Sequence, residues 1–308
     1  MATGCSCDVT LNNTGTQKCK SVMDVAVGGF MVPLYKTNGD INEVDLSTVV
    51  FNKAFFDGKT QNADKTQRWY PVGDFEAVED TRAENVVETA PSGKVFFVQQ
   101  GIRSFKADIF NGSTDYMKQL EASGCTKWGF LPFDKQGNLI YSSKKAGFLR
   151  PIAVDNNSFS ATLVKATDTT LQKLKLNWQW SITENDSDLR FIKSADISYS
   201  VFDVRGLVDI YGAPATSITT TGFQMDLNTN FSDSLTFIKA KGLVIANFVL
   251  FNVTDNAAVT LTSVTESPDG HYAFVFPAQT SADVLRLSVA LTTGYDSTVL
   301  AKVAITIP

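Results

Sequence analysis

Residues 68–110, with the sequence RWYPVGDFEAVEDTRAENVVETAPSGKVFFVQQGIRSFKADIF, are the part of the chain from which its architecture is best inferred. An acidic run with one arginine, 74–88, has no clear period and predicts a long loop. After a Pro-Ser-Gly turn come two apolar runs, 94–98 and 102–110, which predict paired strands joined at 99–101. Because the stretch holds no catalytic motif, we interpret it as a surface that joins one copy of the protein to another.

The charged residues in and beside the acidic run are candidates for contacts between subunits. Arginine forms bidentate pairs with carboxylates and is enriched at protein interfaces. An ordinary ion pair within the chain, which contributes little to stability, explains the two arginines equally well. The residues expected at the subunit interface are Asp74, Glu76, Glu79, Asp80, Arg82, Glu84 and Arg103.

Composition narrows the class of protein. Charged residues make up 19% of the 308 residues, below the usual ~25%, which favours a chain that buries surface in an assembly. The net charge of −5 and the lack of a Lys/Arg-rich run argue against a dedicated nucleic-acid-binding protein. Residues 1–20 do not have the pattern of a secretory signal, and the longest apolar run, 242–251, is far shorter than the ~20 residues that span a bilayer. We expect no membrane association, and a cytoplasmic location unless the protein leaves in a particle.

The chain is long enough for two domains, and its composition changes near residues 211–214. All four tryptophans precede this point, whereas the part after it is poor in charge and rich in Thr, Val, Ala and Ser. Its short apolar runs, separated by turn signals, have the spacing of an immunoglobulin-like sandwich. We predict an extended N-terminal arm at 1–20, a β domain at 21–212 and an immunoglobulin-like domain at 215–308.

The clearest strand pattern covers 173–182, where apolar and polar residues alternate at period two. Such a strand has one face on a core and the other toward water or a partner. Residues 158–164 and 195–201 show the same alternation. The apolar positions of the three segments are Leu174, Leu176, Trp178, Trp180, Ile182, Phe159, Ala161, Leu163, Ile197, Tyr199 and Val201.

One short helix is predicted beside the strands, because Ser113 is a good N-cap and Gly124 a good stop. Residues 45–56 fit a short helix or a strand equally well. Two further runs, 127–133 and 138–141, predict a hairpin. The expected fold class is mainly β, with a sandwich or small barrel followed by an immunoglobulin-like sandwich.

Metal sites are not favoured. The four cysteines, Cys5, Cys7, Cys19 and Cys125, lack the spacing of a structural zinc site and read as reduced thiols. The single histidine, His271, directly follows a predicted turn and is expected to be exposed. The oxygen-rich turn at 184–188 fits a calcium site less well than an ordinary polar turn.

Catalysis is not favoured either. The paired carboxylates would suit glycoside hydrolysis, with tryptophans stacking on sugars, but neighbouring carboxylates on a surface loop are more often simply solvated. No phosphate-binding loop, dinucleotide fingerprint or zinc-protease motif occurs. We predict no enzyme activity and no cofactor. The carboxylate pairs are Asp74 with Glu76, Glu79 with Asp80, and Glu84 with Glu88, and the tryptophans are Trp69, Trp178 and Trp180.

Several segments together suggest a family. The run 68–94, then GIRSFKADIF (101–110), STDYMKQLEASGC (113–125) and KWGFLPFDKQGNLIY (127–141), resembles virion proteins of tailed phages that infect Bacteroidetes-type bacteria. This resemblance, which covers about residues 20–212, identifies the chain as similar to a tail tube subunit. Past residue 214, KGLVIANFVLFN, VTLTSVTESPDGHYAFVFPA and the closing VAITIP resemble immunoglobulin-like modules that are often fused to phage tail proteins.

The resemblance implies a virion structural protein of the tail, assembled in the host cytoplasm. Hexameric rings would join their inner sheets into one β-barrel and stack through long loops and the N-terminal arm. DNA would pass without specific binding, helped by the negative charge of the chain. Other partners would be the tape measure, possibly a sheath, and the terminator, while the outer domain would contact host glycans through many copies. The alternatives are another virion part (capsid jelly roll, tail terminator or decoration protein) or a surface adhesin or glycan-binding module.

Overall fold

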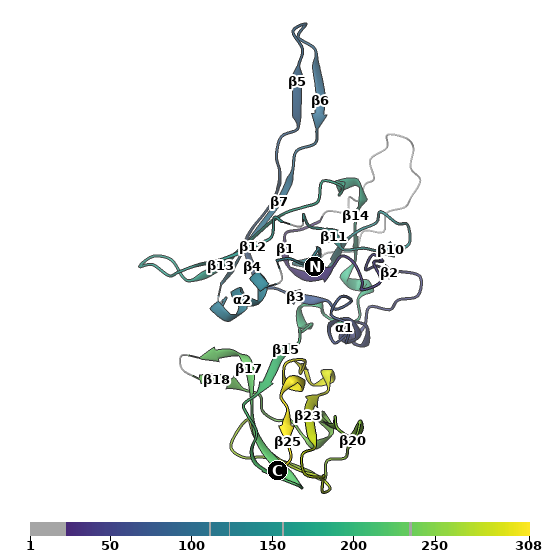
Figure 1. Ribbon diagram of the computed structural model, residues 1–308. Coiled ribbons are helices and arrows are strands. Elements are labelled where there is room, and N and C mark those ends of the chain that lie inside the picture. The colour runs from purple at the N-terminus through teal and green to yellow at the C-terminus, as the bar shows by residue number, and fades with distance from the viewer. Residues whose placement is uncertain (1–22, 111, 123, 156, 234–235) are drawn as a thin grey trace.

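The computed structural model describes residues 23–308 except 111, 123, 156, 234 and 235, and it is mainly β (Figure 1). The first of two sandwiches contains a central sheet in the order β14-β9-β8-β1-β3, with β11 also paired to β8. Its strands are β1 (Ala26–Pro33), β3 (Tyr70–Val72), β8 (Trp128–Asp134), β9 (Leu139–Ser142), β11 (Ile152–Ala153) and β14 (Leu189–Ile192).

The second sheet of this sandwich, called here the outer sheet, has the order β12-β13-β7-β4. Its strands are β4 (Phe75–Arg82), β7 (Arg103–Phe110), β12 (Ser160–Val164) and β13 (Lys173–Gln179). Two small pairs complete the strands: β2 (Val44–Asp45) with β10 (Phe148–Leu149), and β5 (Val86–Thr89) with β6 (Val95–Gln99).

Aromatic side chains fill the space between these two sheets. Phe105 and Trp178 stack with their ring centroids 4.4 Å apart, and Phe130 of the central sheet meets Trp178 edge-on at 5.0 Å. The opposite face of the central sheet is covered by α1 (Lys53–Thr60), where Phe30, Phe56 and neighbouring side chains form a second cluster. Every residue of β8 is therefore buried, as expected for a strand with both faces covered.

The alternation predicted for 173–182 is confirmed in β13, whose apolar side chains are buried and whose polar ones face outward. The pattern ends at Ile182, which is 64% exposed rather than inward-facing. In 158–164, Ala161 is buried as predicted. The strand predicted at 195–201 is wrong, because its ends lie in short 3₁₀ turns at Ser194–Asp196 and Val201–Asp203.

The predicted helix is confirmed as α2 (Thr114–Ala122), and the Ser113 hydroxyl accepts the Tyr116 N–H at 3.1 Å. A second helix, α1, begins in the segment 45–56, for which the sequence fits a helix or a strand equally well. In the ambiguous segment 45–56, Asn52 caps α1 by accepting the Phe55 N–H at 2.9 Å, whereas Asp45 lies in β2. The hairpin predicted after residue 127 is confirmed as β8 and β9.

The second sandwich has its own core. One sheet has the order β21-β22-β17-β15-β24, with β16 and β18 also on β17, and the other has the order β20-β19-β23-β25. Because β15 starts at Val208, these strands begin before the composition change at 211–214. They are β15 (Val208–Gly212), β16 (Thr216–Thr219), β17 (Gly222–Asp233), β18 (Thr236–Lys239), β19 (Phe248–Asn252), β20 (Ala257–Val259), β21 (Ser263–Glu266), β22 (His271–Val275), β23 (Val284–Val289), β24 (Tyr295–Asp296) and β25 (Ile305–Thr306).

Candidate assembly surface

A long hairpin extends from the first sandwich into solvent (Figure 1). The chain leaves the outer sheet at the end of β4, continues through β5, turns at residues 90–94, and returns through β6 into β7. In the turn, the Ala90 N–H donates to the Lys94 carbonyl at 2.8 Å, and Gly93 takes a left-handed φ of +79° that suits glycine. Residues 83–102 are called the projecting hairpin below.

This geometry corrects two expectations. The apolar runs 94–98 and 102–110 are not paired with each other, because β6 pairs with β5 and β7 pairs with β4. The acidic run 74–88 is not a long loop, because it forms most of β4 and β5.

Every residue of β5 and β6 is exposed, although most are apolar. Phe96 and Phe97 are 55% and 63% exposed. Val86, Val87, Val95 and Val98 are also more than half exposed. Burying one such side chain contributes about 1.5–3 kcal/mol, and exposed apolar patches of this kind mark interaction sites. Covering the projecting hairpin with the surface of another molecule therefore lowers the free energy.

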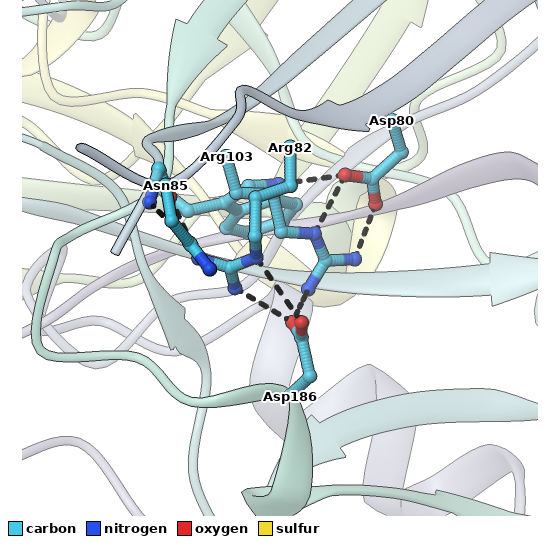
Figure 2. Close-up of polar contacts among 7 residues, drawn as sticks. Asp80, Arg82, Asn85, Arg103 and Asp186 are labelled. Atoms are coloured by element: carbon cyan, nitrogen blue, oxygen red, sulfur yellow. Dashed lines mark hydrogen bonds and ion pairs between the residues drawn. The ribbon is translucent and has the colours of Figure 1, made fainter. Parts of the chain in front are cut away.

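Charged residues fix the base of the hairpin to the first sandwich (Figure 2). Arg82 on β4 makes a bidentate contact with Asp186, at 2.9 and 3.2 Å. Arg103 on β7 makes a bidentate contact with Asp80, at 2.5 and 2.7 Å, and reaches Asp186 at 3.2 Å. Since Asp186 lies just before β14 of the central sheet, these contacts tie the hairpin's root to the other layer. We call Asp80, Arg82, Arg103 and Asp186 the hairpin clamp.

Two backbone contacts complete the root of the hairpin. Arg82 Nη1 donates to the Gly101 carbonyl at 2.9 Å, and the Gly101 N–H donates to Asn85 Oδ1 at 3.0 Å (Figure 2). A Cβ at Gly101 would lie 1.8 Å from the Ala83 carbonyl oxygen, so only glycine fits this crossing of the two strands.

The structure places the seven predicted interface residues in three settings. Arg82, Arg103 and Asp80 belong to the clamp, so the explanation of the arginines as pairs within the chain holds. Glu79 pairs with Lys106 on β7 at 3.2 Å. The remaining residues are exposed, and their contact with another copy stays a prediction; they are Asp74, Glu76 and Glu84. The exposed β6 side chains, which sequence reasoning assigned to an internal pair of strands, are the stronger interface candidates.

We expect Arg82 and Asp186 to be energetically coupled within one chain. Both side chains are partly exposed, so the coupling free energy in a double-mutant cycle of Arg82→Ala and Asp186→Ala should be about 0.5–1 kcal/mol. Urea unfolding of the two single variants and the double variant measures it. Strictly additive effects would mean that Arg82 does not act through Asp186.

The outward face of the outer sheet is polar and its charges are balanced. Lys106 pairs with Glu79, and Lys173 pairs with Asp108 at 2.5 Å. In the described part of the chain, β4 and β12 each have a neighbour on one side only, so both edges of this sheet carry unpaired backbone groups. Such edges are templates for pairing with another chain.

A cavity of about 780 Å³ lies between the two sandwiches. Its mainly apolar wall comes from β3, α2 and β15, with further residues from both sandwiches. Beside it, Arg68 Nη1 of the first sandwich contacts Asp296 of the second at 2.6 Å, and Lys65 reaches the same oxygen at 3.2 Å. Arg68 and Asp296 are only 5% and 3% exposed, so this is a buried ion pair across the junction.

The tryptophans and the histidine considered for chemistry are buried or paired within the chain. Trp69, Trp178 and Trp180 are all in the core, so the idea that they stack on sugars is wrong. His271 is not a free turn residue, because it begins β22 and its Nδ1 lies 2.9 Å from Asp226.

The residues considered as metal ligands show no metal-binding arrangement among the described residues. Within the turn at 184–188, Glu184 accepts from Ser142 and Lys144, and Asp186 belongs to the clamp. Cys125 is an exposed free thiol, and Cys5, Cys7 and Cys19 lie outside the described residues. No group of three His, Cys, Asp or Glu side chains with metal-binding geometry occurs in the part of the chain that the structure describes.

Comparison with known protein families and with curated proteins finds no match for this chain. Among the described residues, no helix has the length and apolar character needed to cross a membrane.

Proposed function

We propose that this chain is a structural subunit of a virion that assembles with copies of itself into the stacked rings of a phage tail tube. The observation that carries the proposal is the projecting hairpin, whose six large apolar side chains on β5 and β6 are exposed in the single chain. An exposed apolar surface of this kind marks a protein–protein interaction site and promotes association when it is left uncovered. The hairpin supplies the contact between copies, and the clamp sets its direction.

Ring closure is assigned to the outer sheet, whose edges pair only after the hairpin contact has brought the copies together. Its two open edges, β4 and β12, allow one copy to add its sheet to that of the next, so that the unpaired N–H and C=O groups of both edges become hydrogen bonded. Repetition around an axis gives a closed barrel that has no free edge. The hexameric number follows from the resemblance to tail tube subunits.

The polar face of the outer sheet would then line the lumen. Lys106 and Lys173 are each held by a carboxylate, and Lys175 is a single exposed lysine between them, so this face offers no row of free cations to DNA phosphates. A balanced wall permits passage of DNA without specific binding. The negative charge of the whole chain is not concentrated on this face, so repulsion plays a smaller part than the net charge suggests.

The second sandwich takes the outward position in this proposal. Its many copies would permit multivalent contact with host glycans. The partners of the whole chain in the virion would be the tape measure, possibly a sheath, and the terminator. The other virion parts named above use the same self-association, and the shape of the assembly separates them from a tube.

Negative-stain electron microscopy of the purified chain at rising concentration tests the proposal. Tubes or six-fold rings with a central channel support it. Closed shells would indicate a capsid part instead, and a chain that stays monomeric at high concentration in light scattering would overturn self-assembly altogether.

A further inference from the structure

The projecting hairpin has two unequal faces. Successive strand residues point to opposite sides, and the register pairs Val87 with Phe97. Val95, two residues from Phe97, shares their side, whereas Phe96 lies opposite Glu88 on the other side. On β5 and β6 the face formed by Val87, Thr89, Val95 and Phe97 carries no charged side chain, whereas the other face carries Glu88, so the first face suits an apolar partner surface better.

The cavity between the two sandwiches has the complementary character. Its wall includes Tyr116 and Leu120 of α2 and Phe231 of β17. Gln119 of α2 also lines it, and its Nε2 is buried with no hydrogen-bond partner among the described residues. A buried donor without an acceptor costs about 1–3 kcal/mol. An incoming strand would bring apolar side chains to this wall, and its backbone carbonyls would accept from the Gln119 amide once that side chain turns toward the cavity.

The hairpin of a chain cannot reach the cavity of the same chain. In Figure 1, β5 and β6 extend from one end of the first sandwich, while β3, α2 and β15, which border the cavity, lie toward the second sandwich at the opposite end. A contact between these two surfaces therefore joins different copies. Because the surfaces differ, the contact is heterologous and repeats from copy to copy along an axis.

We propose that the Val87, Val95 and Phe97 face of the projecting hairpin docks into the cavity between the two sandwiches of another copy. A cavity of about 780 Å³ holds a few side chains rather than a whole hairpin. Exposed Lys127 stands on the cavity wall and suits a hairpin that carries Glu84 near its root, while Glu88, on the opposite face, stays outside the cavity. The inference rests on the proposed function, because it names the receiving surface of the self-assembly.

Site-specific photo-crosslinking locates the receiving surface. The photoreactive p-benzoylphenylalanine replaces Phe97 in one variant and Phe96 in a matched control, and mass spectrometry maps the crosslinked peptides in the assembled protein. We expect the label at 97 to join residues 114–122 or 231 of another copy, and the label at 96 to join other surfaces.

The outcomes separate the two proposals. Assembled protein whose label at 97 joins only surfaces outside the cavity overturns the docking site and leaves self-assembly standing. Wild-type protein that stays monomeric and gives no crosslink between copies overturns both.

Mixing two defective variants gives an independent test. Phe97→Ser removes the inserted side chain, and Ala122→Trp, at an exposed position on the cavity wall, blocks the entrance. Each variant alone should remain monomeric in analytical ultracentrifugation, with circular dichroism showing an intact fold. In a mixture, the Ala122→Trp protein supplies an intact hairpin and the Phe97→Ser protein supplies an intact cavity. The mixture should therefore form one-to-one dimers and no longer species. A mixture with no dimer, or an Ala122→Trp protein that assembles normally, would overturn the docking site.

Discussion

The double variant Phe96→Ser/Phe97→Ser should abolish assembly while leaving the monomer folded. Both phenylalanines are more than half exposed in the single chain, so their removal should change the free energy of unfolding by no more than about 0.5 kcal/mol. If both become buried between copies, the loss per contact is about 3–6 kcal/mol, which weakens association by a factor of a hundred or more. Sedimentation velocity over a concentration series measures the association, and urea unfolding measures the fold.

The matched control lies on β19 in the second sandwich. Val249 and Phe251 are 51% and 36% exposed, and they share one outward face of that strand. Val249→Ser/Phe251→Ser removes exposed apolar surface that does not belong to the hairpin. This control should assemble like the wild type. Equal loss of assembly in both variants would mean that exposed apolar area in general, and not the hairpin, drives association.

Sequence patterns predict best those strands that have one face on the core and the other in water. In β13, Leu174, Leu176 and Trp178 alternate with polar residues because one face meets the core and the other meets water. The sequence predicts a loop in place of β4 because apolar and polar residues do not alternate regularly along this strand. A register shift lies between Glu76 and Glu79, and Ala77 takes a left-handed φ of +48°. A bulge of this kind moves the following side chains to the other face, so no period survives in the sequence.

Apolar and polar residues also alternate in a segment that is not a strand. Tyr199 and Val201 alternate with polar residues because they pack on the cluster under α1, where Tyr199 lies 6.3 Å from Phe56 between ring centroids. The backbone there forms 3₁₀ turns, and a two-residue period alone does not distinguish the two cases.

The sequence directs attention to the stretch 68–110 but not to its contacts. Six exposed large apolar side chains of the described residues lie within 86–98 of this stretch. The clamp was not predictable, because Asp186 lies 104 residues from Arg82 and only the packing of two sheets brings them together. The same holds for Arg68 and Asp296, which are 228 residues apart.

Arg68→Ala should cost about 3 kcal/mol of stability at neutral pH and loosen the junction between the two sandwiches. Removing one partner of a buried ion pair leaves the other charge uncompensated, and Lys65 at 3.2 Å from Asp296 keeps the loss at the lower end of the usual range. Urea unfolding measures the loss, and limited proteolysis at 205–207 reports on the junction. Lys65→Ala, at a half-exposed position, should cost much less. A loss below about 1 kcal/mol for Arg68→Ala would mean that the pair does not hold the junction.

The difference between wild type and Arg68→Ala should also depend on pH. Burial by itself raises the pKa of Asp296, but hydrogen bonds from Arg68, Thr298 and Lys65 outweigh it and leave the pKa well below its usual range. A carboxyl whose pKa is lower in the folded state contributes stability that is fully present above the unfolded value of about 3.9 and is lost as the pH falls toward the folded value. The wild type should therefore lose its advantage over Arg68→Ala in strong acid. Burial raises the pKa of the neighbouring Asp209, which works in the opposite direction, so the comparison needs Asp209→Asn in both backgrounds. A difference that stays constant down to pH values near 2 would show that Arg68 stabilises the junction by packing and not by its charge.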